Sequence, residues 1–195
     1  MRLEPRVLQN RFVRLEPFGE AVRSEVKAAL DVDAEAWSVM SATAMAEHFD
    51  PWWSMILDQT AAGRAQLWAV RRLSDGAVVG VSGYHDMDLA HDGLYVGYTF
   101  YRPEARGGAV NPACKRLLFG EAFDQGAMRV GLMIDAVNAR SQAAVAKMGA
   151  VREGTLRAHK ITWTGRVRDT VVLSVLADEW PAVRDGLDAR LSAFG

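Results

Sequence analysis

The sequence has a single cysteine, almost no net charge and no long apolar run. The lone cysteine, Cys114, excludes an internal disulfide framework and is typical of proteins from a reducing compartment. The 23 lysines and arginines nearly balance the 24 acidic residues, so neither nucleic acid nor an anionic membrane is favoured as a partner. No apolar run approaches the roughly 20 residues of a membrane-spanning helix. These absences predict a soluble protein of the cytoplasm.

Two further signals are missing from the chain. The N-terminal stretch is interrupted by charged residues at Arg2, Glu4 and Arg6, so no secretory apolar region is expected there. The four histidines show no spacing typical of metal ligands, and no metal site is predicted. Cys114 has no histidine or second cysteine nearby in the sequence, so we expect a core residue rather than a nucleophile.

The composition that is present, 50% apolar and 24% charged, is ordinary for a globular protein. A length of 195 residues suits one domain, which we expect to span residues 1–195. Apolar periodicity and turn residues predict strands over residues 12–15, 67–71, 77–84, 94–101, 129–135, 151–162 and 168–176. The same signals predict helices within residues 19–62, with a possible break near Pro51, and over residues 113–123, 141–148 and 178–191.

This order places antiparallel hairpins first and a strand–helix–strand–helix unit in the middle. It predicts an α/β fold, with a mixed, mostly antiparallel twisted sheet of about seven strands and helices on both faces. Along residues 94–101, simple alternation predicts that Val96, Tyr98 and Phe100 share one face of the sheet, while Tyr95 and Tyr101 lie on the other.

The most informative stretch is the middle unit. The strand over residues 94–101 is followed by a glycine-containing turn and then by a helix, which is the layout of a site that holds pyrophosphate on backbone N–H groups. The turn and the helix start contribute Arg106, Gly107, Gly108, Ala109, Val110, Asn111 and Lys115. A plain strand-to-helix turn is the alternative interpretation of this loop.

A second helix follows at a characteristic distance. Asn138, Arg140 and Ser141 open it and Gly149 closes it. Either Asn138 or Ser141 could simply cap the helix, and Arg140 could be a solvated surface residue. The ordered pair of helix starts nevertheless favours one shared ligand site.

Several motifs together resemble the GCN5-related N-acetyltransferase (GNAT) superfamily, and more closely its RimJ/RimL-type branch. They include Gly97 with Tyr98 in the central strand, Asn138 with Ser141 before the second helix, and the ending from Asp169 to Trp180. The resemblance implies a three-layer GNAT-like fold, with acetyl-CoA bound where the strands that contain Gly97 and Leu132 splay apart. It implies direct transfer of the acetyl group to an amine acceptor, either a protein N-terminus or a small molecule.

The resemblance also assigns roles to residues. The cofactor-binding residues would be Gly97, Arg106, Gly107, Gly108, Ala109, Val110, Asn111, Lys115, Asn138, Arg140 and Ser141, with Lys115 reaching a phosphate as a point charge. Ser141 could protonate the departing thiolate. The candidates for accepting the amine proton are His85, Asp86, Tyr98, Glu153 and Asp169, although Asp169 could instead anchor the final hairpin. We take Ser141, Tyr98 and His85 as the catalytic set.

The departures from the family pattern leave alternatives open. Val145 stands where many members carry a tyrosine general acid, and Tyr95 stands where a glutamate is common. A non-catalytic acyl-CoA-binding module is therefore the second hypothesis, and a structural dimerisation domain with a vestigial site is the third. A homodimer formed through the late strands is also possible. Trp37, Trp52 and Trp53 could line the acceptor groove or belong to the core.

Overall fold

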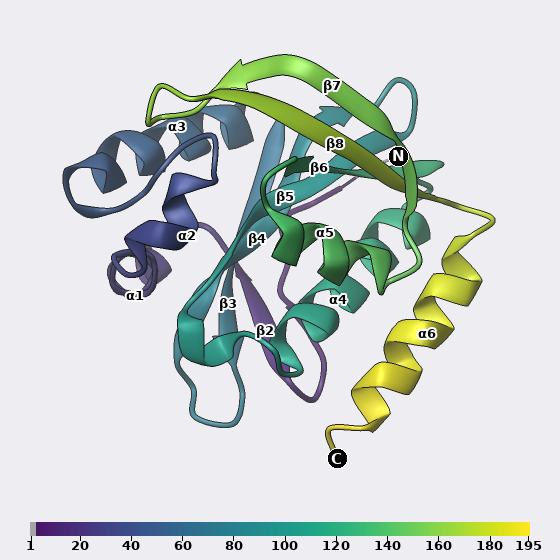
Figure 1. Cartoon of the computed structure of the whole chain (residues 1–195). Coiled ribbons are helices and arrows are strands. Elements are labelled where there is room, and N and C mark those ends of the chain that lie inside the picture. Colours follow the sequence, from purple (N-terminus) through teal and green to yellow (C-terminus); the bar gives the residue numbers. More distant parts are fainter. Residues whose placement is uncertain (1–2) are drawn as a thin grey trace.

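The computed structural model describes residues 3–195, which build one continuous eight-stranded sheet with the strand order β1-β2-β3-β4-β5-β6-β8-β7 (Figure 1). Every neighbouring pair is antiparallel except β5 with β6. The strands are β1 (Leu8–Gln9), β2 (Val13–Pro17), β3 (Ala65–Arg72), β4 (Val78–Asp88), β5 (Gly93–Tyr101), β6 (Arg129–Asp135), β7 (Val151–Ile161) and β8 (Val167–Leu176). The predicted mixed, mostly antiparallel sheet is confirmed.

Helices cover both faces of this sheet (Figure 1). One core packs α1 (Arg23–Leu30), α2 (Ala34–Ser38) and α3 (Phe49–Ala61) against β3, β4 and β5. The other core packs α4 (Val110–Asp124), α5 (Ala139–Ala146) and α6 (Trp180–Ser192) against the opposite face. Three short 3-10 turns, η1 (Glu20–Val22), η2 (Ala46–His48) and η3 (Pro103–Ala105), join these elements. None of the helices within residues 3–195 is long and apolar enough to cross a bilayer.

Two local predictions are corrected by the structure. The sheet has eight strands rather than about seven, because β1 is only two residues long and shows no sequence periodicity. Pro51 does not break a helix, since it lies in the first turn of α3, where a backbone N–H would have no partner within the helix. As expected, Cys114 is buried in the core.

A β-bulge interrupts the pairing of β4 with β5. Val81 lies opposite Phe100 and Gly83 lies opposite Gly97, so β5 has one residue more than β4 between these pairs. Tyr98, within the extra stretch, adopts a left-handed backbone with φ of 49°. Such bulges bend a strand and redirect its side chains and N–H groups.

The bulge also shifts the alternation of side chains along β5. Val96 and Tyr101 lie together in the core shared with α4 and α6, whereas Phe100 and Tyr98 pack on the core of the opposite face. The alternation predicted from the sequence is therefore wrong beyond the bulge, because it assumed a period of two without interruption.

Strands β5 and β6 separate after a short parallel contact. Only three pairs join them, Gly93 with Arg129, Leu94 with Val130 and Tyr95 with Gly131. From Val96 onward, β5 has no strand partner on this side, although β6 continues its antiparallel pairing with β8. The sheet is thus split at its centre, and this opening positions the candidate site.

Candidate functional site

A cavity of about 350 Å³ occupies the split between β5 and β6. Its walls come from these two strands, the start of α4, α5, the segment after α2, and the β7–β8 hairpin. The residues predicted from the sequence that line it are His85, Gly97, Tyr98, Arg106, Gly107, Asn111, Lys115, Asn138, Arg140 and Ser141. Gly108, Ala109 and Val110 belong to the adjoining loop and helix start and are not part of the cavity wall.

The start of α4 offers backbone donors to this cavity. Gly107 has a φ of 78°, a left-handed conformation that glycine adopts without strain, and it turns the chain into the helix. Ala109 is the N-cap and provides no side-chain hydrogen bond, so the first N–H groups of α4 have no partner within the helix. The side chain of Val110 is in the core, which leaves only its backbone for a ligand. The buried Oδ1 of Asn111 has no hydrogen-bond partner among the described residues. The free N–H groups suit an anion, whereas the Oδ1 of Asn111 suits a ligand group that donates a hydrogen bond.

Arg106 is held in place by groups on three sides. Its guanidinium forms an ion pair with Asp33, donates from Nε to the carbonyl oxygen of Tyr101 at 2.7 Å, and lies 5.4 Å from the centre of the Phe100 ring. Asp33 also accepts a hydrogen bond from the N–H of Ala36 and thereby caps α2. The hydrogen bond from Arg106 lowers the pKa of the Asp33 carboxyl below its usual value. The pair therefore ties the glycine loop to α2.

Lys115 is a buried cation without a carboxylate partner. Its ammonium donates to the hydroxyl groups of Thr99 at 2.7 Å and Ser82 at 3.1 Å, both next to the bulge. The residue is 4% exposed, and burial lowers the pKa of its ammonium to about 8. No carboxylate in the described part of the chain forms an ion pair with it, and its side chain lines the cavity. A desolvated charge that lacks a counter-ion is typical of a functional site.

The start of α5 resolves the capping alternatives. The Oδ1 of Asn138 accepts a hydrogen bond from the N–H of Ser141 at 3.0 Å, so Asn138 is the N-cap and Ser141 is not. Ser141 lines the cavity as the third residue of the helix. Arg140 also lines the cavity, and its charge helps to lower the pKa of Asp33. Val145 is buried in the core and also contributes to the cavity wall.

His85 is oriented by its neighbours. Its Nδ1 lies 3.0 Å from the Oδ2 of Asp86, and this hydrogen bond lowers the pKa of that carboxyl. The ring stacks on Tyr95 at 5.6 Å between centroids and meets Tyr98 edge-on at 5.4 Å. The Nε2 lies over Gly97, where a Cβ atom would clash with it. A carboxylate at Nδ1 favours the tautomer whose Nε2 can accept a proton at the cavity.

Tyr98 is less suited to accepting a proton. Its hydroxyl donates to Oε1 of Gln59 at 3.3 Å. Burial, with a smaller contribution from the charge of Asp86, raises the pKa of the phenol above its usual value. The phenol therefore stays protonated at neutral pH and can take part in hydrogen bonds, but it is not a base there.

Two other acidic candidates lie outside the cavity wall. Glu153 pairs with Arg129 and accepts a hydrogen bond from Ser174, and the arginine lowers the pKa of its carboxyl. Asp169 accepts a hydrogen bond from the N–H of Ala158 at 2.7 Å across the β7–β8 hairpin. The alternative role of Asp169 as a hairpin anchor is thus confirmed.

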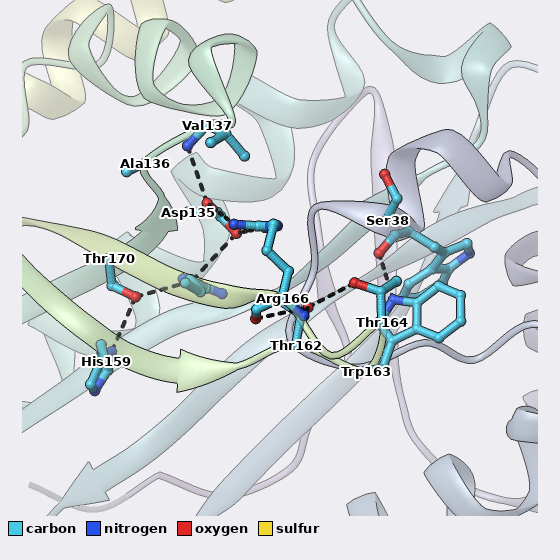
Figure 2. Close-up of polar contacts among 12 residues, drawn as sticks. Ser38, Asp135, Ala136, Val137, His159, Thr162, Trp163, Thr164, Arg166 and Thr170 are labelled. Atoms are coloured by element: carbon cyan, nitrogen blue, oxygen red, sulfur yellow. Dashed lines mark hydrogen bonds and ion pairs between the residues drawn. The ribbon is translucent and has the colours of Figure 1, made fainter.

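An ionic network that the sequence did not reveal closes the end of β6 (Figure 2). Asp135 is buried there, forms an ion pair with Arg166, and lies 3.9 Å from Nε of Arg168. Arg168 in turn donates from Nε to the hydroxyl of Thr170 at 3.0 Å. Both arginines belong to the β7–β8 hairpin region, so the network fixes this hairpin beside the cavity. Its members are far apart in sequence and give no local motif.

The tip of the same hairpin contacts the segment after α2. Trp163 donates from its backbone N–H to the carbonyl oxygen of Ser41 at 3.2 Å and from Nε1 to the carbonyl oxygen of Trp37 at 2.9 Å. Trp37 stacks on Phe100 at 4.4 Å between centroids. Trp37, Trp52 and Trp53 are all buried in the core, as one alternative predicted, and Trp37 and Trp52 also line the cavity. Within residues 3–195, no cluster of histidine, cysteine and acidic side chains could hold a metal ion.

Solved structures share this architecture. A protein from T. thermophilus that is classed as an acetyltransferase superposes with a TM-score of 0.85 at 32% identity, covering 98% of this chain and 100% of its own. A GCN5-related N-acetyltransferase from Brucella melitensis gives a TM-score of 0.88 at 26% identity, covering 99% and 91%. Mycobacterium smegmatis RimJ, solved with CoA-disulfide, shares the fold at a TM-score of 0.80 and 19% identity over 95% and 94%.

No curated protein matches the chain at a significant level. The model of the acetyltransferase (GNAT) domain family, whose members use acetyl-CoA, matches residues 13–151. That span includes the split strands, the glycine loop and the helix capped by Asn138. The chain therefore belongs to the GNAT acetyltransferase family.

Proposed function

We propose that this protein transfers the acetyl group of acetyl-CoA directly to an amine acceptor. The observation that carries the proposal is the split between β5 and β6, where a cavity meets the free N–H groups of α4 and the buried ammonium of Lys115, which has no carboxylate partner among the described residues. Bound acetyl-CoA would supply the acetyl group as a thioester.

The residues around the cavity fit this cofactor. The N–H groups of the glycine loop and of the first turn of α4 would hold the pyrophosphate. The unpartnered Oδ1 of Asn111 could accept a hydrogen bond from a donor group of the cofactor. Lys115 would supply positive charge to the same site, and Arg140 would reach a phosphate from α5. Arg106 would position the loop through Asp33. The proposed loop residues are Gly107, Gly108, Ala109, Val110 and Asn111.

Proton transfer falls to His85 in this proposal. An α-amino group has a pKa near 8 and a lysine near 10.4, so the acceptor must lose a proton before it can attack. The Nε2 of His85 would take that proton while Asp86 holds the ring through Nδ1. The hydroxyl of Ser141 would give a proton on the other side of the cavity. The unpaired edge of β5, with Gly97 and Tyr98, offers N–H groups to developing negative charge.

Other structures with this fold support the cofactor. M. smegmatis RimJ was solved with CoA-disulfide, and the microcin C7 self-immunity acetyltransferase MccE was solved with acetyl-CoA and AMP. A ribosomal-protein-S5-alanine acetyltransferase from Vibrio fischeri also shares the fold, at 14% identity. We keep the RimJ/RimL branch, a cytoplasmic location and a homodimer through the exposed edge strand β7 as parts of the proposal.

A non-catalytic CoA-binding module is the alternative, favoured by Val145, whose buried side chain cannot act as the acid found in many family members. A turnover measurement distinguishes the enzyme from the non-catalytic CoA-binding module. Thiol release from acetyl-CoA would be followed across a panel of amines, with the acetylated amine identified by mass. Amine-dependent product that falls by about 100-fold or more in a His85→Ala variant supports the enzyme, since general base catalysis contributes on that order. Hydrolysis alone, unchanged by any amine, contradicts it.

A further inference from the structure

The charges that line the cavity are strongly unbalanced. Its basic wall residues are Arg106, Lys115, Arg140, Lys160 and Arg168, whereas Asp135 is the only acidic residue of the described chain in this wall. Three of these cations lie on the glycine loop, α4 and α5, next to the helix starts proposed for the cofactor phosphates. The remaining two, Lys160 and Arg168, lie on the β7–β8 hairpin. Arg168 belongs to the network that fixes this hairpin, and neither residue has been given a role toward a ligand.

Lys160 and Arg168 form one cluster. They are direct cross-strand partners in the pairing of β7 with β8, so their positions are fixed relative to each other. The ammonium of Lys160 makes no hydrogen bond or ion pair with the rest of residues 3–195, although its charge contributes to lowering the pKa of Asp86. Asp86 is the carboxylate that orients His85.

The single acidic wall residue does not neutralise this cluster. Asp135 already forms an ion pair with Arg166 (Figure 2). Its Oδ2 also lies 3.9 Å from Nε of Arg168. Arg168 uses Nε for Thr170 and Nη2 for the carbonyl oxygen of Met133, while its Nη1 donates to no group of the described chain. Burial lowers the pKa of the Arg168 guanidinium, and the charge of Asp135 offsets this only in part. Positive charge remains available to a ligand.

The hairpin that carries the cluster also limits what can reach it. Trp163 bonds to the backbone of Trp37 and Ser41, so the hairpin tip and the segment after α2 bridge this side of the cavity. An extended polypeptide crossing the site would have to break both hydrogen bonds. A small molecule, or the free end of a polypeptide, could enter without breaking these hydrogen bonds.

We propose that Lys160 and Arg168 form an anion subsite of the acceptor, and that the acceptor is a small amine that also carries a carboxylate or phosphate group. The inference rests on the proposed function, because it assigns the chemistry of the second substrate to the same cavity. The anion pairs with the hairpin cations while the amine faces His85. Polycationic amines, such as polyamines, are disfavoured by like charge at the same place.

The subsite is tested first by measuring the binding of ligands that cannot be acetylated. The protein would be saturated with CoA and titrated calorimetrically with N-acetyl-leucine and N-acetyl-leucinamide, which differ in the charge of one group. N-acetyl-O-phosphoethanolamine and N-acetylethanolamine form the phosphate arm. We expect the anionic member of at least one pair to bind about tenfold tighter or more, which corresponds to about 1.4 kcal/mol. The pair of ligands with the larger difference in affinity shows whether the subsite prefers a carboxylate or a phosphate.

Charge reversal provides the matched variant. Lys160→Glu should abolish or invert the preference, whereas Arg157→Gln, an exposed cation of the same strand that does not line the cavity, should leave it unchanged. Equal binding of the charged and neutral members, no binding of either, or a preference that survives Lys160→Glu would overturn the inference.

Kinetics then separate this inference from the proposed function. The free amines of the same pairs would be compared with spermidine by kcat/KM. Efficient turnover of neutral amines or of spermidine would retain the enzyme but contradict the anion subsite. A preference for the anionic amines that is lost in Lys160→Glu supports both.

Discussion

Replacing Lys115 with methionine should stabilise the protein in the absence of ligand. Methionine keeps the length of the side chain and removes the buried charge. In the wild-type protein the ammonium is desolvated without a carboxylate partner, and this lowers its pKa from 10.5 to about 8. The charged form is therefore less favourable in the folded protein than in the unfolded chain, and Lys115→Met removes that penalty.

The size of the expected stabilisation follows from the pKa shift of Lys115. A difference between 10.5 and about 8 corresponds to about 3 kcal/mol at about 1.4 kcal/mol per pKa unit. The variant loses two hydrogen bonds worth about 1 kcal/mol each. The hydroxyls of Ser82 and Thr99 lie 2.8 Å apart and remain bonded to each other, so neither is left unpaired. The expected net gain is about 1 kcal/mol at pH 7, or roughly 2 to 4 °C in Tm for a chain of this length.

The pH dependence of the stability difference shows whether the buried charge of Lys115 is its cause. Below pH 8 Lys115 is charged in both states and the penalty is complete. Between about pH 8 and 10.5 the unfolded chain binds more protons, so the stability of the wild type should rise toward that of the variant. Above 10.5 the difference should vanish or reverse.

The assay is urea denaturation of both proteins from pH 6 to about pH 11, with Lys147→Met, at an exposed position, as the control. The variant should also bind acetyl-CoA more weakly, since Lys115 is proposed to face its phosphates. A destabilised Lys115→Met variant, or a gain that does not change with pH, would refute the view that Lys115 is an uncompensated buried cation kept for a ligand.

Three further predictions concern single positions. Gly97→Ala places a methyl group against Nε2 of His85, so amine transfer should fall by about 100-fold in kcat/KM while circular dichroism stays native; normal kinetics would remove His85 from the site. Asn138→Ala removes the N-cap of α5 and should lower the free energy of unfolding by about 1 kcal/mol, whereas Asn138→Asp should retain it. Asp33→Asn breaks the ion pair with Arg106, so the variant should be less stable above about pH 4, and the deficit should fade as the pH falls below 3.8, where the lowered pKa of Asp33 is crossed. A deficit in Asp33→Asn that persists in acid would show that charge is not its cause.

Local patterns in the sequence were sufficient for most of the sheet. The strand expected over residues 129–135 is observed as β6 (Arg129–Asp135), because a short apolar run between turn residues defines it. The family resemblance placed the opening between the strands of Gly97 and Leu132, where the structure has it. Alternation along β5 failed only at the bulge, where Tyr98 takes a backbone conformation that no periodicity indicates.

The parts of the site that the sequence did not predict depend on distant pairs. Asp33 and Arg106 are 73 residues apart, and Trp163 and Trp37 are 126 apart. Such contacts follow from how the sheet brings segments together, and no spacing rule along one chain reports them. The hydroxyl partners of Lys115 were missed for the same reason, since Lys115 is on α4 and its partners lie on β4 and β5.

The central claim is that the split between β5 and β6 binds acetyl-CoA, and calorimetric titration with acetyl-CoA and with CoA tests it most directly. Gly108→Val is the informative variant, because a side chain at Gly108 meets open space in the protein itself and would obstruct only a ligand on the loop. Gly154→Val, at an equally open position on β7, is the control. We predict micromolar binding of both ligands to the wild type and the control, and none to Gly108→Val. Absence of binding to the wild type at millimolar concentration, or equal binding to Gly108→Val, would contradict the account.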